Sequence, residues 1–500
     1  MSEQGPDTRA GLEQYRALRR QLEEQILPLA TSVDGRRFSY QASLHRLQLQ
    51  TGGYVMLGVG SEQRLGQVVT LGVRHHDALD VASPDEAADA GHRARMVIRG
   101  AEGEGRVLSG DASPFHDATV RPATPEEVRD HLEDVAPRRA RLEIGELLLA
   151  PGVPFSLDSG GFGRHTFLCG QSGSGKTYSL GVVLEQLLLE TELQLIVLDP
   201  NSDFVRLGEL RPDAAGPEAS RYTESTRTLT VRRADDGLAL VFAELEPSAQ
   251  AAALRLDPVA DREEYTELVT LTEGGRALTL ERLVALEREG GAGRRLVERA
   301  RNLGLLRWGI WAGTERRSLL PELARDDVRC LVVDLGSLST REEQSLAAAA
   351  VLGELWRRRT DRRPVLIVID EAHNVCPARP EDPLTAIATE YAVRIAGEGR
   401  KFGLYLLVST QRPQKVHENV LSQCDNLLLM RMNSLADLGF VADVFSFVPP
   451  SLLEGATTFR QGESLAAGPI APHPAFVRFG RRLAQEGGGD VPADWSRPGT

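Results

Sequence analysis

The stretch of sequence that decides the fold is TFLCGQSGSGKT, residues 166–177. Its last eight residues satisfy the pattern GxxxxGK[ST] at every position, and glycines at this spacing let backbone N–H groups turn inward and hold phosphate oxygens. A short apolar strand precedes the loop, and a helix with apolar residues at three- and four-residue steps follows it, so the helix N-terminus favours an anion. The predicted nucleotide-binding residues are Gly170, Gln171, Ser172, Gly173, Ser174, Gly175, Lys176 and Thr177. We expect Lys176 to reach the β- and γ-phosphates and Thr177 to ligate Mg²⁺.

Two carboxylates follow the apolar run Val365–Ile369. Strands of an α/β sheet bind ligands at their carboxyl ends, so this run predicts a central strand that delivers Asp370 and Glu371 to the site. Asp370 suits a contact with Mg²⁺, and Glu371 suits the activation of a water that attacks the γ-phosphate. The alternative is an acidic loop that caps the next helix. We expect His373 to be a hydrogen-bonding partner near the site rather than a catalytic acid.

A polar segment, STQRP at 409–413, follows the apolar run Leu404–Val408. An amide at the end of a strand beside the site can contact the γ-phosphate or the attacking water, so Gln411 is the candidate sensor; a turn-forming polar cluster is the alternative. Just upstream, GRKFG at 399–403 holds Arg400 between glycines. Arg400 could project into a neighbouring subunit's site and stabilise transition-state charge, and Lys401 could share that role.

A third strand end carries further carboxylates. The run Leu195–Leu198 leads into DPNSDF, residues 199–204. Asp199 and Asp203 could support the site or contact DNA, and a helix-capping role is about equally consistent with the pattern.

The pattern of apolar runs indicates two kinds of domain. From residue 165 onward, short apolar runs alternate with helical stretches, which is typical of a parallel sheet covered on both faces. Residues 36–110 alternate with a period of two between glycine-rich turns, which predicts a small β-barrel or sandwich. We therefore expect an α/β protein with a mainly parallel sheet, an N-terminal small β-barrel and a helical insertion.

Domain boundaries follow from the same changes of pattern. The stretch between the second and third strands of the core is too long for a simple crossover and has helical spacing, so it is interpreted as an insertion. The expected units are an N-terminal helix at 1–30, a barrel at 31–110, a connector at 111–140, a core at 141–204 and 326–485, a helical insertion at 205–325 and a disordered tail at 486–500. The N-terminal helix packs on its own domain or, alternatively, contacts another subunit.

The composition is that of a globular chain of several domains, with 500 residues of which 41% are hydrophobic and 26% charged. Its apolar stretches are far shorter than the roughly 20 residues that cross a bilayer. The first ten residues lack a basic segment followed by an apolar one, so no secretory signal is expected. The four cysteines lie far apart with no CxxC spacing, which favours buried, reduced thiols. We expect a soluble cytoplasmic protein without membrane contact.

The charge balance limits how the chain could bind nucleic acid. A net charge of −13 argues against contact over the whole surface, although a ring can be acidic outside and basic at its pore. Only three of the 58 basic residues are lysines, Lys176, Lys401 and Lys415, and all three lie in or beside the motifs above. Since none of the three is followed by x-Asp, the [NT]KxD motif of guanine-specific GTPases is absent. The LSGGQ-like signature of ABC transporters is absent too.

Taken together, the five motifs resemble the HerA group of the HerA/FtsK ATPases. The segments that carry the resemblance are GQSGSGKT (170–177), LIVLDPNSDF (195–204), VLIVIDEAHN (365–374), GEGRKFG (397–403) and STQRP (409–413). The resemblance spans about 30–480 and implies a RecA-like ATPase core, an N-terminal barrel like the HAS barrel, and a hexamer driven by ATP and Mg²⁺ along double-stranded DNA. It also implies a partner, either a nuclease or an antiphage effector.

The resemblance implies roles for individual residues. Lys176 and Thr177 take the nucleotide-loop roles, Asp370 and Glu371 the acidic-strand roles, Gln411 that of the sensor and Arg400 that of the trans-acting finger. No catalytic role is carried over to Asp203, because Asp203-Phe204 stands where many relatives have Glu-Tyr. The chain shows no nuclease constellation, so DNA cleavage would come from a partner. The alternative functions are an ATP-gated scaffold that regulates an effector enzyme and, less favoured, a secretion-type ATPase.

Several basic residues are candidates for contact with DNA. A translocase holds phosphates with a few basic residues, because backbone contact is independent of base sequence. The candidates are Arg412, Lys415, Arg294, Arg295, Arg299 and Arg301. For the last four, which lie on an Arg-rich helix, a solvated helix face is the alternative.

Overall fold

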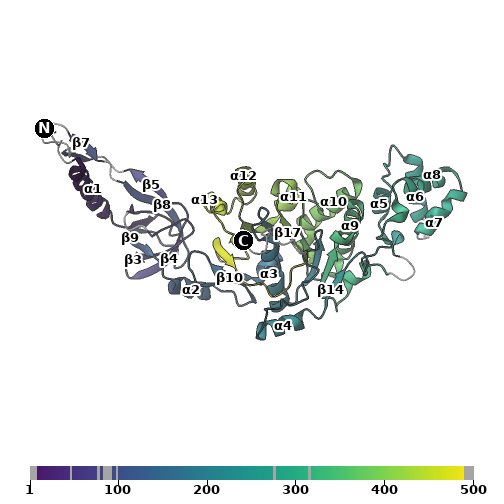
Figure 1. Cartoon of the computed structure of the whole chain (residues 1–500), viewed down its shortest axis with the longest axis horizontal. Coiled ribbons are helices and arrows are strands. Elements are labelled where there is room, and N and C mark those ends of the chain that lie inside the picture. Colours follow the sequence, from purple (N-terminus) through teal and green to yellow (C-terminus); the bar gives the residue numbers. More distant parts are fainter. Residues whose placement is uncertain are drawn as a thin grey trace, which may run out of the picture.

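The computed structural model describes residues 8–44, 48–75, 79–82, 93–96, 99–273, 278–312 and 317–488. The chain forms three successive parts (Figure 1): an N-terminal barrel at one end, a sheet flanked by helices in the middle, and a helical lobe at the other end. The predicted disordered tail at 486–500 lies outside the described residues beyond position 488. In the described part of the chain, no helix is long and apolar enough to span a membrane.

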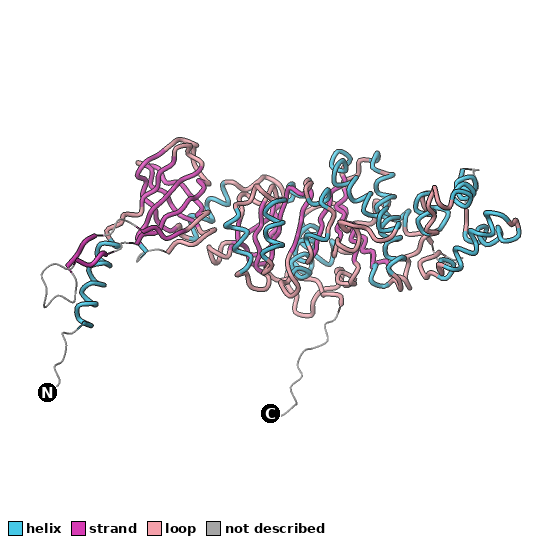
Figure 2. Tube along the Cα trace, turned by 90° about the horizontal axis from the view of Figure 1, so that it is seen from above, coloured by secondary structure: helices cyan, strands magenta, loops and turns pink. Residues whose placement is uncertain are grey.

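The N-terminal part is a closed barrel. Its strands follow the order β2-β1-β9-β3-β4-β8, and pairing of β2 with β8 closes it, with β5 added beside β8. Inward residues alternate along β2, where Phe38, Tyr40 and Ala42 are buried. The strands are β1 (Leu29–Ser32), β2 (Arg37–Ser43), β3 (Tyr54–Val59), β4 (Glu62–Val68), β5 (Gly72–His75), β8 (Arg99–Val107) and β9 (Phe115–Pro122). In Figure 2 these strands form a block separate from the strands of the main sheet.

The structure corrects the predicted connector at 111–140. Strand β9 completes the barrel, because Ala118 and Val120 point into its core while Phe115 pairs with Ser32 of β1. The register shifts between Ala30 and Ser32, and this irregularity breaks the alternation that would have revealed the strand in the sequence. Helix α2 (Pro125–Asp134) follows, starting from a capping box at Thr124. Helix α1 (Thr8–Glu24) and the paired strands β6 (Leu79–Ala82) and β7 (Arg93–Met96) complete this end of the chain.

The middle part is built on an 11-stranded sheet with the order β11-β10-β20-β19-β18-β12-β17-β16-β13-β15-β14. The strands from β18 to β14 run parallel, and those from β11 to β18 run antiparallel. The sheet is therefore mixed, and its parallel half carries the predicted motifs. The strands are β10 (Arg141–Leu147), β11 (Pro154–Asp158), β12 (His165–Cys169), β13 (Gln194–Asp199), β14 (Leu229–Arg232), β15 (Cys330–Asp334), β16 (Val365–Ile369), β17 (Leu404–Thr410), β18 (Cys424–Met430), β19 (Glu463–Ala467) and β20 (Ala475–Phe479).

Helices cover both faces of the sheet. On one face α3 (Lys176–Glu190) packs on residues such as Leu366 and Leu407. On the other face α9 (Arg341–Arg357) and α10 (Pro383–Glu398) pack on Ile367 and Leu406, which adjoin Leu366 and Leu407 along the strands. Because successive side chains of a strand point to opposite faces, strands buried on both sides read as continuous apolar runs, as expected from the sequence. The remaining helices of this part are α4 (Pro217–Ser225), α11 (Glu418–Leu421), α12 (Leu435–Val444) and α13 (Pro450–Glu454).

The stretch 205–325 is only partly the helical insertion that the sequence predicts. Residues 229–232 form β14, which extends the sheet beside β15 with Leu229 opposite Cys330. All four of its residues are half-buried, so this edge strand has neither the alternation nor the apolar run that marks a strand. The lobe that remains consists of α5 (Pro247–Ala253), α6 (Arg262–Glu273), α7 (Leu280–Ala285) and α8 (Gly291–Asn302).

Candidate nucleotide-binding and hydrolysis site

The phosphate-binding loop joins β12 to α3, as the motif predicts. Gly173 and Gly175 adopt positive φ angles of 73° and 91°, which L side chains rarely tolerate. A Cβ at Gly170 would lie 2.7 Å from both Met430 Cβ and Ser174 Oγ, so only glycine fits there. The loop thus presents backbone N–H groups at the N-terminus of α3, an arrangement that binds anions.

Lys176 lies at the centre of the site and is buried. Its Nζ is 2.9 Å from Asp370 Oδ1, 3.1 Å from Glu371 Oε1 and 3.2 Å from Ser409 Oγ. Burial favours the neutral amine, but the carboxylates of Asp370 and Glu371 outweigh it and raise the pKa of Lys176. The structure therefore brings together the ends of β12, β16 and β17 around one charged amine.

Glu371 follows β16 with a φ of 42°, an uncommon conformation for a residue other than glycine. Burial tends to raise the pKa of its carboxyl, but His373 and Lys176 reverse that effect and lower the pKa below its usual value. His373 Nδ1 lies 3.2 Å from Glu371 Oε2 and 3.0 Å from Thr410 Oγ1. Glu371 is thus ionised at neutral pH and held between two partners, the state that a general base requires.

Three carboxylates lie together at this edge of the sheet. Oxygens of Asp199, Asp203 and Asp370 are all within 4.8 Å of one another. Burial and the charge of Asp370 raise the pKa of Asp199 to about 7 and that of Asp203 to about 6, although backbone N–H groups donate to Asp199. These N–H groups belong to Asp203 and Phe204, so Asp199 has a turn-capping role.

The residues at this edge fit Mg²⁺. Asp370 is fully buried, and its Oδ2 has no hydrogen-bond partner among the described residues. An unpaired buried carboxylate oxygen is costly unless a cation compensates it, and carboxylate and hydroxyl oxygens are ligands that Mg²⁺ prefers. Thr177 supplies a hydroxyl from the first turn of α3.

The sensor candidate Gln411 lies immediately after β17, and β17 lies between the loop strand β12 and the acidic strand β16. This order places the segment at 409–411 beside both motifs. The side chains that make the contacts here are those of Ser409 and Thr410, the first with Lys176 and the second with His373. Sequence reasoning missed both, although they stand in the motif that drew attention to Gln411.

Arg400 lies at the amino ends of the parallel strands, whereas the phosphate loop lies at their carboxyl ends. It precedes β17, whose seven residues span about 20 Å, and its guanidinium is 3.5 Å from Asp425 at the start of β18. Arg164, which precedes β12, lies 3.0 Å from the same carboxylate. Arg400 therefore does not belong to the site of its own chain.

One further basic side chain contacts the loop and was not anticipated. Arg431, directly after β18, donates from Nη2 to Gly173 O at 3.0 Å. The neighbouring Asn433 N–H donates to Gln171 Oε1 at 3.1 Å. The only sequence signal is a polar segment that follows the apolar run of β18, as in the three motifs above.

Comparisons with known proteins find similarity to HerA helicases. A family model described as "Helicase HerA, central domain" matches residues 142–290. The DNA double-strand break repair helicase HerA of Saccharolobus solfataricus is 25% identical over 394 residues, 74% of each chain, and that of Sulfolobus acidocaldarius is 23% identical over 418 residues, 79% of each chain. That of Sulfurisphaera tokodaii is 35% identical over 127 residues, and the match spans only 25% of each chain.

Among solved structures, VirB4 of Thermoanaerobacter pseudethanolicus aligns over 69% of this chain and 98% of its own, with a TM-score of 0.49 and 16% identity. The two long alignments with HerA helicases extend well beyond the loop motif, and in the structure the ends of β12, β16 and β17 meet around Lys176. Over about three quarters of its length the chain is similar to HerA helicases, and residues 142–290 match the model of their central domain.

Proposed function

We propose that this chain is a Mg-ATP-dependent, ring-forming motor that translocates on or unwinds double-stranded DNA together with a partner nuclease or defence effector. The observation that carries the proposal is the 3.1 Å contact between Lys176 of the phosphate loop and Glu371 of the acidic strand. It supports hydrolysis, because a phosphate-binding amine and a candidate base face the same space. The names of the HerA helicases that align over about three quarters of the chain support DNA as the substrate.

The residues divide the work of hydrolysis as follows. The loop and Lys176 hold the phosphates, and Lys176 exchanges its carboxylate partners for phosphate oxygens when ATP enters. Glu371 then accepts the proton of the attacking water, and Gln411 orients that water at the end of the neighbouring strand. Thr177 and Asp370 would hold Mg²⁺, which supplies charge stabilisation to the phosphates.

Arg400 completes the site of a neighbouring subunit in this proposal. Its position at the amino ends of the strands, away from the phosphate loop of its own chain, supports a contact in trans. In a ring with heterologous interfaces, one side of each subunit contacts a different side of the next subunit. Lys401 lies in the same short turn, Gly399–Phe402, and could share the role.

We expect Arg400→Ala and Lys176→Ala each to abolish turnover in a homogeneous ring, and mixtures of the two to recover activity. In an equal mixture, roughly a quarter of the interfaces pair an intact loop with an intact finger. ATPase assays across mixing ratios measure the recovery. Mixing Lys176→Ala with Glu371→Gln is the control, because both defects lie on the same side of the interface and no recovery is expected. Mixed rings that stay inactive at every ratio would contradict the assignment.

The motor is tested against the gate alternative with DNA. Duplex DNA should stimulate the ATPase, and ATP should drive displacement of a triplex-forming strand. If the ATPase rate is the same with and without DNA but changes when a co-purified effector is added, the proposal of a motor is wrong and that of an ATP-gated scaffold is supported.

A further inference from the structure

A groove of about 1070 Å³ lies beside the hydrolysis site, at the carboxyl edge of the parallel strands. Its walls come from the segments that follow β13, β15, β16 and β17 and from the first turns of α9 and α10. His373 is part of its lining, so the groove begins where the catalytic segment ends. It opens on the α9 and α10 side of the sheet, whereas the phosphate loop leads into α3 on the other side.

The groove concentrates unneutralised positive charge. Arg341, Arg379, Arg412 and Lys415 line it and are exposed, and none of their side chains has an ion pair or hydrogen bond within the described residues. The other charges are mostly satisfied: Arg255 pairs with Glu342 at 3.2 Å, and Asp382 caps α10. Glu381 is the remaining exposed carboxylate of the lining. In a chain with a net charge of −13, this local excess of cations matches a polyanion.

The Arg-rich helix α8 carries no such unneutralised positive charge among its described side chains. Its four arginines are all paired: Arg294 with Glu298, Arg295 with Glu263 and Glu264, Arg299 with Asp261, and Arg301 with Glu287. A phosphate strand would have to displace these carboxylates. From the sequence, these arginines and the pair Arg412 and Lys415 are equal candidates for contact with DNA. In the structure the arginines of α8 are paired with carboxylates, whereas Arg412 and Lys415 have no ion pair within the described residues.

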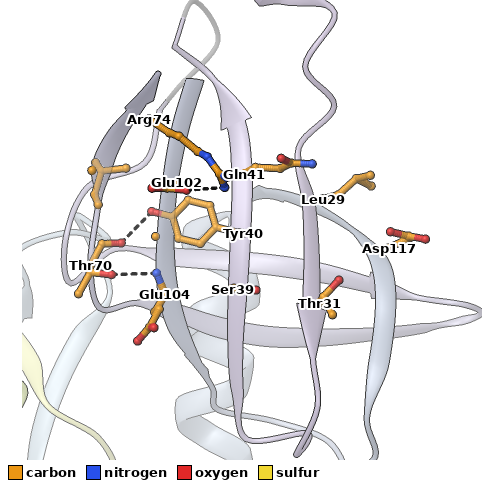
Figure 3. Close-up of a pocket in the computed structure, with 13 residues that line it drawn as sticks. Leu29, Thr31, Ser39, Tyr40, Gln41, Thr70, Arg74, Glu102, Glu104 and Asp117 are labelled. Atoms are coloured by element: carbon orange, nitrogen blue, oxygen red, sulfur yellow. Dashed lines mark hydrogen bonds and ion pairs between the residues drawn. The ribbon is translucent and has the colours of Figure 1, made fainter. Parts of the chain in front are cut away.

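A second cavity, of about 670 Å³, lies on the barrel, and its charges have the opposite sign (Figure 3). Glu102, Glu104 and Asp117 line it, and its one arginine, Arg74, already pairs with Glu102 at 3.1 Å. This cavity does not suit a polyanion.

The groove is connected to the catalytic carboxylate by direct contacts. Thr410 Oγ1 accepts a hydrogen bond from the backbone N–H of Arg412 at 3.0 Å and contacts His373 Nδ1. The same Nδ1 contacts Glu371, and one nitrogen can make a strong hydrogen bond to only one of these two oxygens at a time. A shift of the Arg412 segment therefore changes how His373 is shared between Thr410 and Glu371.

The two loops that form the groove are also joined to each other. His417 N–H donates to Cys376 O at 3.0 Å, and Ala378 N–H donates to Lys415 O at 2.8 Å. Because the backbone is bonded at both points, a ligand that moves one loop moves the other.

We propose that the sugar–phosphate backbone of one DNA strand of a duplex lies in this groove, held by Arg341, Arg379, Arg412 and Lys415, and that its binding repositions Glu371 through Thr410 and His373. This inference rests on the proposed function as a DNA motor. It adds which surface holds the DNA and how DNA binding regulates hydrolysis.

The binding part is tested with the triple variant Arg379→Ala/Arg412→Ala/Lys415→Ala. Its affinity for duplex DNA, measured by fluorescence anisotropy, should fall at least about tenfold, and the slope of log affinity against log salt should become shallower by about 0.9 for each phosphate that the variant no longer neutralises. The matched control, Arg294→Ala/Arg295→Ala/Arg301→Ala, changes the net charge equally and should bind like the wild type. Equal reductions of DNA affinity in both variants, or no reduction in the first, would overturn the proposal that the groove holds the DNA. A wild-type chain that binds no duplex would overturn the proposed function itself.

The regulatory part is tested with Thr410→Val, which removes the hydroxyl and keeps the shape of the side chain. This variant should bind DNA with wild-type affinity, but DNA should no longer stimulate its ATPase. Thr410→Ser restores the hydroxyl and should restore the stimulation. Undiminished stimulation in Thr410→Val, or no rescue by Thr410→Ser, would overturn the connection through His373 and leave the function as a motor standing.

Discussion

Replacing Glu371 by Gln should lower ATP turnover by about 10²–10⁴-fold, the usual contribution of a general base. Glu371 is ionised, and Lys176 and His373 hold it in place. Gln keeps the size and the hydrogen-bonding capacity of the side chain but cannot accept the proton of the attacking water. The phosphate loop is unchanged, so ATP should still bind, and steady-state turnover together with equilibrium binding of a fluorescent ATP analogue separates the two effects.

The matched control for this substitution is Glu390→Gln on α10. Glu390 is exposed and pairs with Arg394, far along the helix from the site, so its loss should leave turnover unchanged. Wild-type turnover in Glu371→Gln would show that another group activates the water. Loss of ATP binding in that variant would show that Glu371 mainly holds the loop in shape.

Replacing Glu185 by Ala should lower the free energy of unfolding by about 3–5 kcal/mol, because the change leaves a buried arginine without its partner. Glu185 on α3 and Arg482 after β20 are both fully buried, with Arg482 Nε 3.0 Å from Glu185 Oε1. The same carboxylate accepts the backbone N–H groups of Leu483 at 2.7 Å and Ala484 at 3.0 Å. One side chain thus fastens the segment at 482–484 to the helix that begins with Lys176.

Urea denaturation measures this loss, and Glu190→Ala is the matched control. Glu190 lies on the same helix and pairs with Arg221, which is more than half exposed, so its loss should cost less than about 1 kcal/mol. The double variant Glu185→Leu/Arg482→Met should recover most of the stability, since apolar side chains can replace a buried ion pair. If Glu185→Ala costs no more than Glu190→Ala, the buried pair does not hold the segment in place.

The sequence predicted those parts of the fold and site that are encoded in consecutive residues. The phosphate loop needs glycines, a lysine and a hydroxyl at set positions, and all of them fall within residues 170–177. The strands β16 and β17 are buried on both faces, so each appears as an unbroken apolar run. The carboxyl ends of parallel strands share one edge of a sheet, which predicted that Asp370 and Glu371 would lie near the loop.

Elements without such a local pattern were missed. The register of β9 shifts against β1, with an extra residue in β9, and β14 is a half-buried edge strand of four residues, so neither produces a regular signal. Both form because a neighbouring strand offers free backbone groups, and that neighbour is β15 for β14 and β1 with β3 for β9.

By itself the sequence determined the class of this protein, a P-loop ATPase with a barrel before its core, because loop conformation and strand burial depend on short stretches of chain. Only the tertiary structure decided which charges meet. The arginines of α8 and those of the groove are the same residue type, and they differ only in whether the fold brings a carboxylate to them. Likewise Glu185 and Arg482, or Thr410 and His373, become partners only when distant segments pack, because Coulomb and hydrogen-bond energies depend on distance in space and not on separation along the chain.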